Sequence, residues 1–138
     1  MIRKASQDDI ASIAQIIKSL DFPGFKVSSS ENIKKRMTKE DWYVLEENRK
    51  LRAVIALAYN EKSCEIYAIA SNVKGGGSEL IKHAINICRE KKITKLWCWS
   101  MARYQAEGFY KKMGFEERHL SKKQFYNEDY WLLVKVIS

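Results

Sequence analysis

The sequence has little proline or glycine, with 1 proline and 6 glycines among 138 residues. That scarcity excludes a collagen-like chain, a linker-rich architecture and a low-complexity tract. Long apolar runs are also missing, since the longest uncharged apolar stretch is residues 53–59, well short of the roughly 20 residues that cross a bilayer. Arg3 and Lys4 are followed by Asp8 and Asp9 rather than by an apolar core. We therefore expect neither a signal peptide nor a membrane partner.

Cysteine and histidine are too sparse for a disulfide framework or a metal cluster. The three cysteines, Cys64, Cys88 and Cys98, are an odd number and include no Cys-x-x-Cys pair. We expect reduced thiols that behave as small buried hydrophobes, which fits a cytoplasmic protein. The two histidines, His83 and His119, lie in different segments. The sequence therefore predicts no metal site.

Positive charge and apolar residues are what the chain does have. Its 25 Lys and Arg against 17 Asp and Glu give a net charge of +8, and 46% of its residues are hydrophobic. The length favours one domain, residues 1–138, because domains run to roughly 100–200 residues. The charge suits a nucleic acid, an anionic surface or a phosphorylated cofactor.

A nucleic-acid partner is the weakest of these interpretations. The basic runs at residues 34–36, 89–92 and 111–112 fall on separate predicted helices. Acidic residues also interrupt the basic runs, so solvated helix faces explain them better than a nucleic-acid interface does.

Hydrophobic periodicity predicts an α/β fold with a mixed sheet, in the order β-α-α-β-β-β-α-β-α-β-β. The strands are expected at residues 2–4, 42–46, 51–59, 65–70, 95–99, 115–120 and 130–137. A capping box at Ser6 and Asp9 predicts the first helix, and serines 28–30 predict a cap for the second. The two helices that follow are expected after the glycine run at residues 75–77 and from Ala106 to Met113. The polar and aromatic segment 121–129 is expected to be a loop.

The most informative segment lies between a predicted strand and a predicted helix, and reads Asn72, Val73, Lys74, Gly75, Gly76, Gly77 and Ser78. Successive glycines let the backbone approach a ligand and turn N–H groups outward. The helix that follows adds the positive end of its dipole, which favours an anion. Lys74 is the best side-chain candidate for a phosphate contact. A plain flexible turn is the competing interpretation.

The glycine spacing excludes two well-known phosphate loops. A P-loop counted from Gly75 would need its glycine and lysine where Leu80 and its neighbour stand. A dinucleotide fingerprint would need a glycine three residues after Gly77, which is again Leu80. If the segment binds a diphosphate, that group belongs to a cofactor other than those bound by the P-loop and by the dinucleotide fingerprint.

The first of two motifs resembles the GNAT superfamily of N-acetyltransferases. Asn72-x-x-Gly75-x-Gly77, followed by Leu80 and Ile81, is similar to the family's Gln/Arg-x-x-Gly-x-Gly/Ala. In that family the amides of this loop hold the pyrophosphate of acetyl-CoA. Asn72 departs from the usual glutamine or arginine.

The second family motif follows in the right order, after one predicted helix and one predicted strand. Ala106-x-x-Phe109-Tyr110-x-x-x-Gly114-Phe115 resembles the family's pattern of Ala, Phe or Leu, Tyr, then Gly-Phe. Together the two motifs are far more specific than either one. A core aromatic on the apolar helix face is the competing interpretation of Tyr110.

The resemblance covers essentially the whole chain and implies a mostly antiparallel sheet of about seven strands with helices on both faces. It implies acetyl-CoA as acyl donor, direct attack by an acceptor amine, and Tyr110 as the general acid for the leaving thiolate. Arg103 stands where the family commonly has an asparagine near the pantetheine arm. The implied cofactor-binding residues are Ala68, Ile69, Asn72, Val73, Lys74, Gly75, Gly76, Gly77, Ser78, Arg103 and Ala106.

The general base is harder to assign. Glu65 lies near the region where some relatives carry a glutamate that deprotonates amines through water, and Glu46 and Glu47 are competitors. Each of these is more often a solvated surface carboxylate. A backbone N–H near Ile69 is the expected donor to the oxyanion.

The acceptor is an amine of a small molecule or a protein, and the sequence does not identify it. A catalytically weak GNAT-like module that binds coenzyme A or docks a partner is the alternative function, favoured by Arg103 and by a compressed segment before the loop. Dimers are common among relatives, so a homodimer is one expected assembly.

Overall fold

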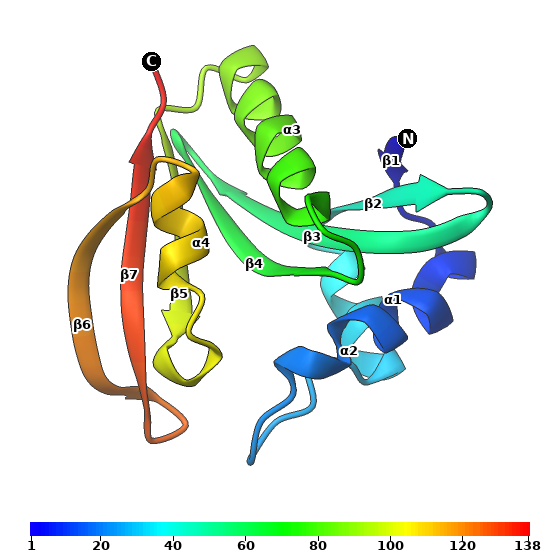
Figure 1. Ribbon diagram of the computed structural model, residues 1–138, viewed down its shortest axis with the longest axis horizontal. Helices are drawn as coiled ribbons and strands as arrows, with labels where there is room; N and C mark the ends of the chain where they lie inside the picture. The colour runs from blue at the N-terminus through cyan, green and yellow to red at the C-terminus, as the bar shows by residue number, and fades with distance from the viewer. The chain divides into compact units, whose positions relative to one another are not determined.

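The computed structural model describes residues 1–138. Seven strands form one sheet in the order β1-β2-β3-β4-β5-β7-β6 (Figure 1). The strands are β1 (Ile2–Lys4), β2 (Asp41–Glu47), β3 (Lys50–Asn60), β4 (Ser63–Ser71), β5 (Lys95–Met101), β6 (Glu116–Phe125) and β7 (Glu128–Val136). The α-helices are α1 (Ile10–Ile17), α2 (Ser30–Met37), α3 (Gly76–Glu90) and α4 (Glu107–Lys112). This confirms the predicted α/β class and the predicted order of elements.

The chain divides into two compact units. The first comprises Met1–Ala58 and Tyr67–His83, and the second comprises Tyr59–Ile66 and Ala84–Ser138. The elements β3, β4 and α3 each contribute residues to both units.

In the first unit, α1 and α2 lie on one side of β2 and β3, and the start of α3 lies on the other (Figure 1). The strands pair antiparallel, with Trp42 opposite Ala56. Ile13 and Ile17 of α1 are fully buried against this sheet, because apolar residues at helical spacing form one face. The Ser29 Oγ accepts a hydrogen bond from the Asn32 amide at 3.1 Å, so the predicted serine cap of α2 is confirmed.

In the second unit, β5 joins β4 in parallel and β7 in antiparallel pairing. Ser63 lies opposite Lys95 in the first pair and Cys98 lies opposite Leu133 in the second. The helix α4 runs alongside β5 and β7 (Figure 1), and Tyr110 is its buried residue. All three cysteines are buried thiols, as predicted.

The expected loop at residues 121–129 is instead strand and a tight turn. The strand β6 continues to Phe125 and β7 begins at Glu128, which leaves Tyr126 and Asn127 as the turn. Both have positive φ, 53° and 59°, the backbone conformation that joins two twisted strands through two residues. The prediction failed because the polar residues of 121–124 show no apolar alternation. The strand pairing that includes Ser121 with Tyr130 and Phe125 with Glu128, with an irregular register between them, depends on β7. None of the helices combines the length and the apolar character that a transmembrane span requires.

Candidate active site

The segment between β4 and α3 is closed by the side chain at the end of the strand. The Ser71 Oγ accepts a hydrogen bond from the Val73 amide at 3.1 Å and donates one to the Val73 carbonyl at 2.6 Å. The Asn72 amide donates to the Arg52 carbonyl of β3 at 2.7 Å. These bonds fix the path of the chain into α3. Sequence reasoning missed Ser71, although a serine followed by asparagine at a strand end is a turn signal.

Gly75 and Gly76 serve different purposes. Gly75 has φ +83°, a left-handed conformation that favours glycine, and a Cβ there would meet nothing within 4 Å. Gly76 is buried, and a Cβ there would lie 2.3 Å from the Ser71 Oγ and 3.2 Å from the Ala53 Cβ. Gly75 therefore shapes an open surface of the loop, whereas Gly76 lets the helix start pack on the sheet.

The start of α3 presents amides and a positive dipole. The Gly76 amide donates to the Val73 carbonyl at 3.2 Å and the Glu79 amide donates to the Gly75 carbonyl at 3.1 Å. Between these amides lie those of Gly77 and Ser78, in the first turn, where an α-helix offers no carbonyl of a preceding turn. The helix has 15 residues, which is long enough for a substantial macrodipole. Backbone amides at this end suit an anionic group.

The remaining residues predicted to bind cofactor in this unit are placed as follows. Asn72 and Lys74 are exposed at the surface, and Val73 is half-buried. Ala68 of β4 is buried and packs in the core beside α1 and α2, whereas Ile69 is half-buried. Any ligand contact of Ala68 therefore uses its backbone, and Lys74 is the one charged side chain of the loop.

The second unit holds Tyr110 in an aromatic setting. Its ring centroid is 5.3 Å from that of Phe109 and 5.3 Å from that of Phe115, both edge to face. The Tyr110 amide donates to the Ala106 carbonyl at 3.2 Å, and the Phe115 amide donates to the Tyr110 carbonyl at 3.0 Å. Tyr110 is 5% exposed, so ring and backbone are both fixed. Ala106 is the residue that caps α4.

The Tyr110 side chain lies near the Cys98 thiol on β5, and each group influences the pKa of the other. Burial raises the pKa of Tyr110 well above its ordinary value, and the neighbouring Cys98 adds to that rise. Burial also raises the pKa of Cys98 to about 12, against the opposing effect of the neighbouring Tyr110 hydroxyl. Both groups are therefore protonated at neutral pH, and Cys98 is unsuited to act as a nucleophile. Sequence reasoning set Cys98 aside and missed this contact, which joins distant segments.

Glu65, the predicted general base, lies on the strand next to the one that carries Cys98. It is half-buried on β4 and lies opposite Trp97 of β5, so its side chain is on the other face of the sheet from that of Cys98. Its negative charge nevertheless contributes to the raised pKa of Cys98. Glu65 therefore acts on Cys98 from the other face of the sheet and does not share the face of the Cys98 side chain.

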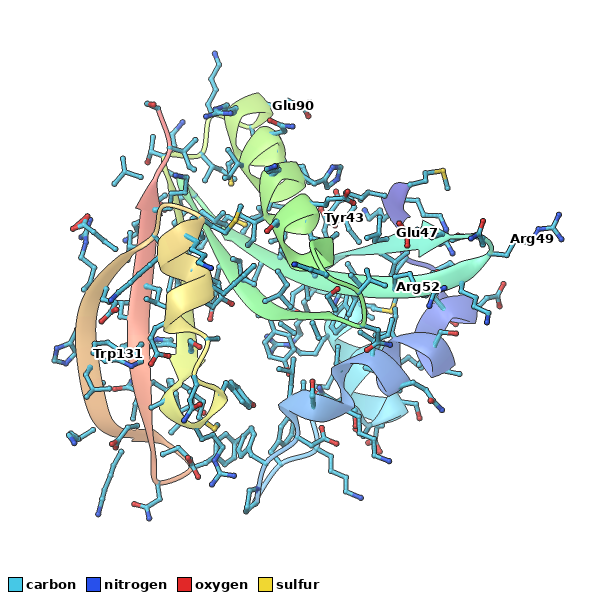
Figure 2. The ribbon with its side chains drawn as sticks, in the orientation of Figure 1. Tyr43, Glu47, Arg49, Arg52, Glu90 and Trp131 are labelled. Carbon is cyan, nitrogen blue, oxygen red and sulfur yellow. The ribbon has the colours of Figure 1, made fainter.

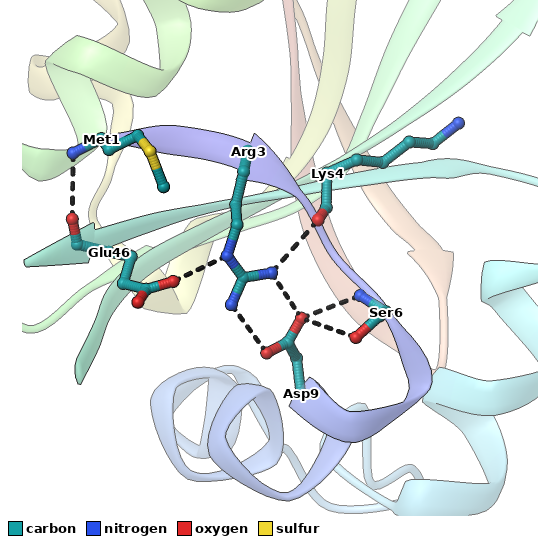
Figure 3. A network of polar contacts seen from close by, with 6 residues as sticks. All are labelled: Met1, Arg3, Lys4, Ser6, Asp9 and Glu46. Carbon is teal, nitrogen blue, oxygen red and sulfur yellow. Dashed lines mark hydrogen bonds and ion pairs between the residues drawn. The ribbon is translucent and has the colours of Figure 1, made fainter. Parts of the chain in front are cut away.

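The two competing carboxylates are located elsewhere, in the first unit. The Glu46 Oε1 accepts a hydrogen bond from the Arg3 Nε at 2.6 Å, within a network that also binds Asp9 (Figure 3). Glu47 is exposed at the end of β2, ahead of the turn that carries Arg49 (Figure 2). Glu46 is therefore part of a structural ion pair.

Arg103 forms an ion pair with Glu128, a residue that the sequence did not indicate. Its Nε donates to the Glu128 Oε1 at 3.0 Å and its second guanidinium nitrogen, Nη2, donates to the Oε2 at 2.7 Å. This two-point bond joins the short turn after β5 to the start of β7. To bind a phosphate, Arg103 would have to break its hydrogen bonds with Glu128. No group of three or more His, Cys, Asp or Glu side chains is arranged to hold a metal ion.

Comparison with known proteins relates the chain to acetyltransferases. The model of the acetyltransferase (GNAT) family matches residues 10–115. No curated protein matches the sequence. Among solved structures, the ribosomal-protein-S18-alanine N-acetyltransferase from Escherichia coli has a TM-score of 0.83 at 19% identity, covering 100% of this chain and 94% of that one.

Two further solved structures are similar over nearly their whole length. Ard1 from Thermoplasma volcanium has a TM-score of 0.84 at 18% identity, covering 100% of this chain and 97% of that one. The ribosomal-protein-alanine N-acetyltransferase from Brucella melitensis has a TM-score of 0.82 at 18% identity, covering 99% of each chain. At these identities the likeness concerns the fold.

Proposed function

Because this chain belongs to the acetyltransferase (GNAT) family, we propose that it transfers the acetyl group of acetyl-CoA to an acceptor amine. Acetyl-CoA supplies the acetyl group as a thioester, which a neutral amine attacks directly without a covalent enzyme intermediate. The observation that carries the proposal is the buried Tyr110, whose raised pKa keeps its hydroxyl protonated at neutral pH. We propose that the chain works as one domain, residues 1–138, and that a homodimer is its assembly.

The loop before α3 is suited to the diphosphate of the cofactor. The amides of Gly77 and Ser78 and the helix dipole would meet its negative charge. Gly75 leaves the surface of the loop open, since a Cβ there would meet nothing within 4 Å. Lys74 and Asn72 are exposed beside it. The fit rests on backbone groups, and Lys74 would add one charge-assisted contact.

The remaining cofactor contacts lie outside the loop. The backbone of Ala68 and Ile69 would hold the pantetheine arm, with an amide near Ile69 as donor to the oxyanion. Ala106 begins the helix that carries Tyr110, and Arg103 would reach the cofactor by leaving Glu128.

Tyr110 would donate a proton to the thiolate as it leaves. A raised pKa keeps the hydroxyl protonated across the physiological range, so the donor form is always present. A thiol has a pKa near 8.5 and leaves tolerably as the anion, so the acid accelerates the reaction without being indispensable. Glu65, acting through water, would take the proton from the acceptor amine.

The proposed acceptor is an amine, carried by a small molecule or by a protein. Two structural neighbours are named for ribosomal-protein alanine acetylation, so a peptide with an N-terminal alanine belongs in the first panel. The panel also includes a polyamine, an amino acid and a lysine peptide. Mass spectrometry of each acceptor after incubation with acetyl-CoA tests the proposal, and transfer to none of them contradicts it.

The alternative function, a coenzyme A binding or partner-docking module with weak catalysis, is favoured by the bond that ties Arg103 to Glu128. Calorimetric titration with acetyl-CoA separates the two. Binding without turnover on any acceptor supports the module, whereas binding with turnover supports the enzyme.

A further inference from the structure

The Tyr67 hydroxyl of β4 accepts a hydrogen bond and keeps its own proton for another partner. The Asn32 side-chain amide donates to the Tyr67 hydroxyl oxygen at 3.1 Å and to the Val27 carbonyl at 3.0 Å. A carbonyl can only accept, so the Val27 contact fixes which end of the amide is the nitrogen. An amide nitrogen can only donate, so the hydroxyl is the acceptor in its bond with Asn32. The hydroxyl proton is therefore directed elsewhere.

Two further contacts hold the ring that carries this hydroxyl. The Arg36 guanidinium carbon lies 3.6 Å from the centre of the Tyr67 ring, and the centre of the Trp42 ring lies 6.3 Å from it. Arg36 is itself held by an ion pair with Glu40, whose side chain is 4% exposed. Asn32 and Arg36 are one helical turn apart on α2, so one face of that helix contacts both the hydroxyl and the ring.

Tyr67 lies beside the backbone to which the proposed function assigns the reacting thioester. It precedes Ala68 and Ile69 on β4, and an amide near Ile69 is the proposed donor to the oxyanion. Residues two apart on a strand are separated by about 7 Å. Tyr67 is half-buried, so part of its side chain remains at the surface. A tyrosine in this place can meet a group attached to the attacking amine.

We propose that Tyr67 is a specificity-determining residue, whose hydroxyl donates a hydrogen bond to a carbonyl or carboxylate oxygen next to the attacking amine. This inference rests on the proposed function and names the class of acceptor. An α-amine, as in an amino acid or at the N-terminus of a peptide, has its carbonyl carbon two bonds from the amine nitrogen. A polyamine has no oxygen, and the amine of a lysine side chain has none near it. Protonated amines can only donate, so neither offers the acceptor that the Tyr67 hydroxyl requires.

A structural role, in which Tyr67 only anchors α2 to β4, is the competing interpretation. Tyr67→Phe keeps the ring with its contacts to Arg36 and Trp42 and removes only the hydroxyl. An anchor alone predicts a lower melting temperature and an equal change of rate for every acceptor. A specificity-determining hydroxyl predicts a loss of rate that is confined to α-amines.

The experiment measures kcat/KM of the native protein and of Tyr67→Phe on an N-terminal-alanine peptide, free alanine, spermidine and an N-terminally blocked lysine peptide. We expect the native protein to prefer the peptide α-amine or free alanine. Tyr67→Phe should lower kcat/KM on these two about tenfold, the effect of one hydrogen bond, and change any activity on the others less than about twofold. Comparing variant and native protein on the same acceptor cancels differences in amine basicity.

Tyr59→Phe is the matched control. A cation also lies over that ring, since the Lys91 Nζ is 4.9 Å from its centre. The variant removes the hydroxyl of a tyrosine that has no part in the proposed function. It should leave kcat/KM unchanged on every acceptor.

Asn32→Asp tests the direction of the proton while the Tyr67 hydroxyl is still present. A carboxylate at this position accepts a hydrogen bond from the hydroxyl and so draws its proton away from the acceptor. We expect the same loss on α-amines as in Tyr67→Phe, and no further loss when the two substitutions are combined. Position 32 is in the first turn of α2, where a negative charge is favourable, so the helix should remain folded.

Three results overturn the inference while the acetyltransferase function stands. The first is a native preference for spermidine or the lysine peptide over both α-amines. The second is an equal change on all acceptors, or no change, in Tyr67→Phe, and the third is full native activity in Asn32→Asp. A preference for the peptide assigns the bound oxygen to a carbonyl, and one for free alanine assigns it to a carboxylate, and both support the inference. No transfer to any amine by the native protein would instead refute the proposed function.

Discussion

Tyr110 of α4 and Cys98 of β5 lie close together, and both side chains are almost completely buried. The contact joins α4 to β5 and explains why the pKa of Tyr110 is raised by burial and by its sulfur neighbour together. A tyrosine in this state stays protonated while it faces a sulfur atom. The same chemistry is required of an acid that protonates a leaving thiolate.

The Arg3–Asp9 ion pair should make the free energy of unfolding depend on pH in the acid range (Figure 3). Hydrogen bonds from Arg3, at 2.8 and 3.0 Å, lower the pKa of Asp9 from 3.8 to about 2. The stability from this shift is present above about pH 4 and is lost as the pH falls through the folded pKa.

Urea unfolding between pH 7 and pH 2 measures this contribution. Native protein should lose about 2 kcal/mol between pH 4 and pH 2 that Asp9→Asn does not lose. The control is Asp8→Asn, an exposed carboxylate on the same turn, which should follow the native curve. Parallel curves for the native protein and Asp9→Asn would contradict the prediction.

Gly76 and Gly108 should respond in opposite directions to alanine. At Gly76 a Cβ would lie 2.3 Å from the Ser71 Oγ, whereas at Gly108 it would meet nothing within 4 Å. We expect Gly76→Ala to lower the melting temperature and weaken acetyl-CoA binding, because the start of α3 must shift. Gly108→Ala should stabilise the protein by up to about 1 kcal/mol, because alanine favours a helix.

Thermal melts of these variants test the steric argument directly. Adding Ser71→Ala to Gly76→Ala should recover part of the lost stability, since the closest atom is removed. A Gly76→Ala variant as stable as the native protein would contradict the close packing of the helix start on β4.

The bond between Arg103 and Glu128 decides whether Arg103 serves the cofactor. If Arg103 exchanges Glu128 for a phosphate, as proposed, Arg103→Ala should raise the KM for acetyl-CoA about fivefold. Glu128→Gln should lower it, because the guanidinium is released. Both substitutions should cost less than about 1 kcal/mol of stability, since the Arg103 side chain is 45% exposed. Equal increases of KM in both variants would show that the Arg103–Glu128 pair has a structural role, and would contradict a contact between Arg103 and the cofactor.

The sequence predicted the elements well where the signal is local. Apolar residues at helical spacing identify α1, and Ser29 identifies the start of α2, because each acts through neighbours in sequence. The glycine run located the start of α3, and the structure adds that Gly76 packs closely against Ser71.

Long-range contacts were beyond the reach of local patterns. The partners of Tyr110 and Arg103, which are Cys98 and Glu128, are distant in sequence and become neighbours only through strand pairing and helix packing. The hairpin at Tyr126 was missed for the same reason, because the pairing of Ser121 with Tyr130 and of Phe125 with Glu128 depends on the strand β7 that follows the turn.

The most direct test of the account is the rate of acetyl transfer to an accepted amine by native protein and by Tyr110→Phe. Tyr130→Phe is the matched control, because Tyr130 is also a buried tyrosine of the second unit. We predict that native protein and Tyr130→Phe transfer at equal rates and that kcat of Tyr110→Phe falls about 100-fold or more without vanishing. Undiminished transfer by Tyr110→Phe, or no transfer by the native protein, would contradict the account.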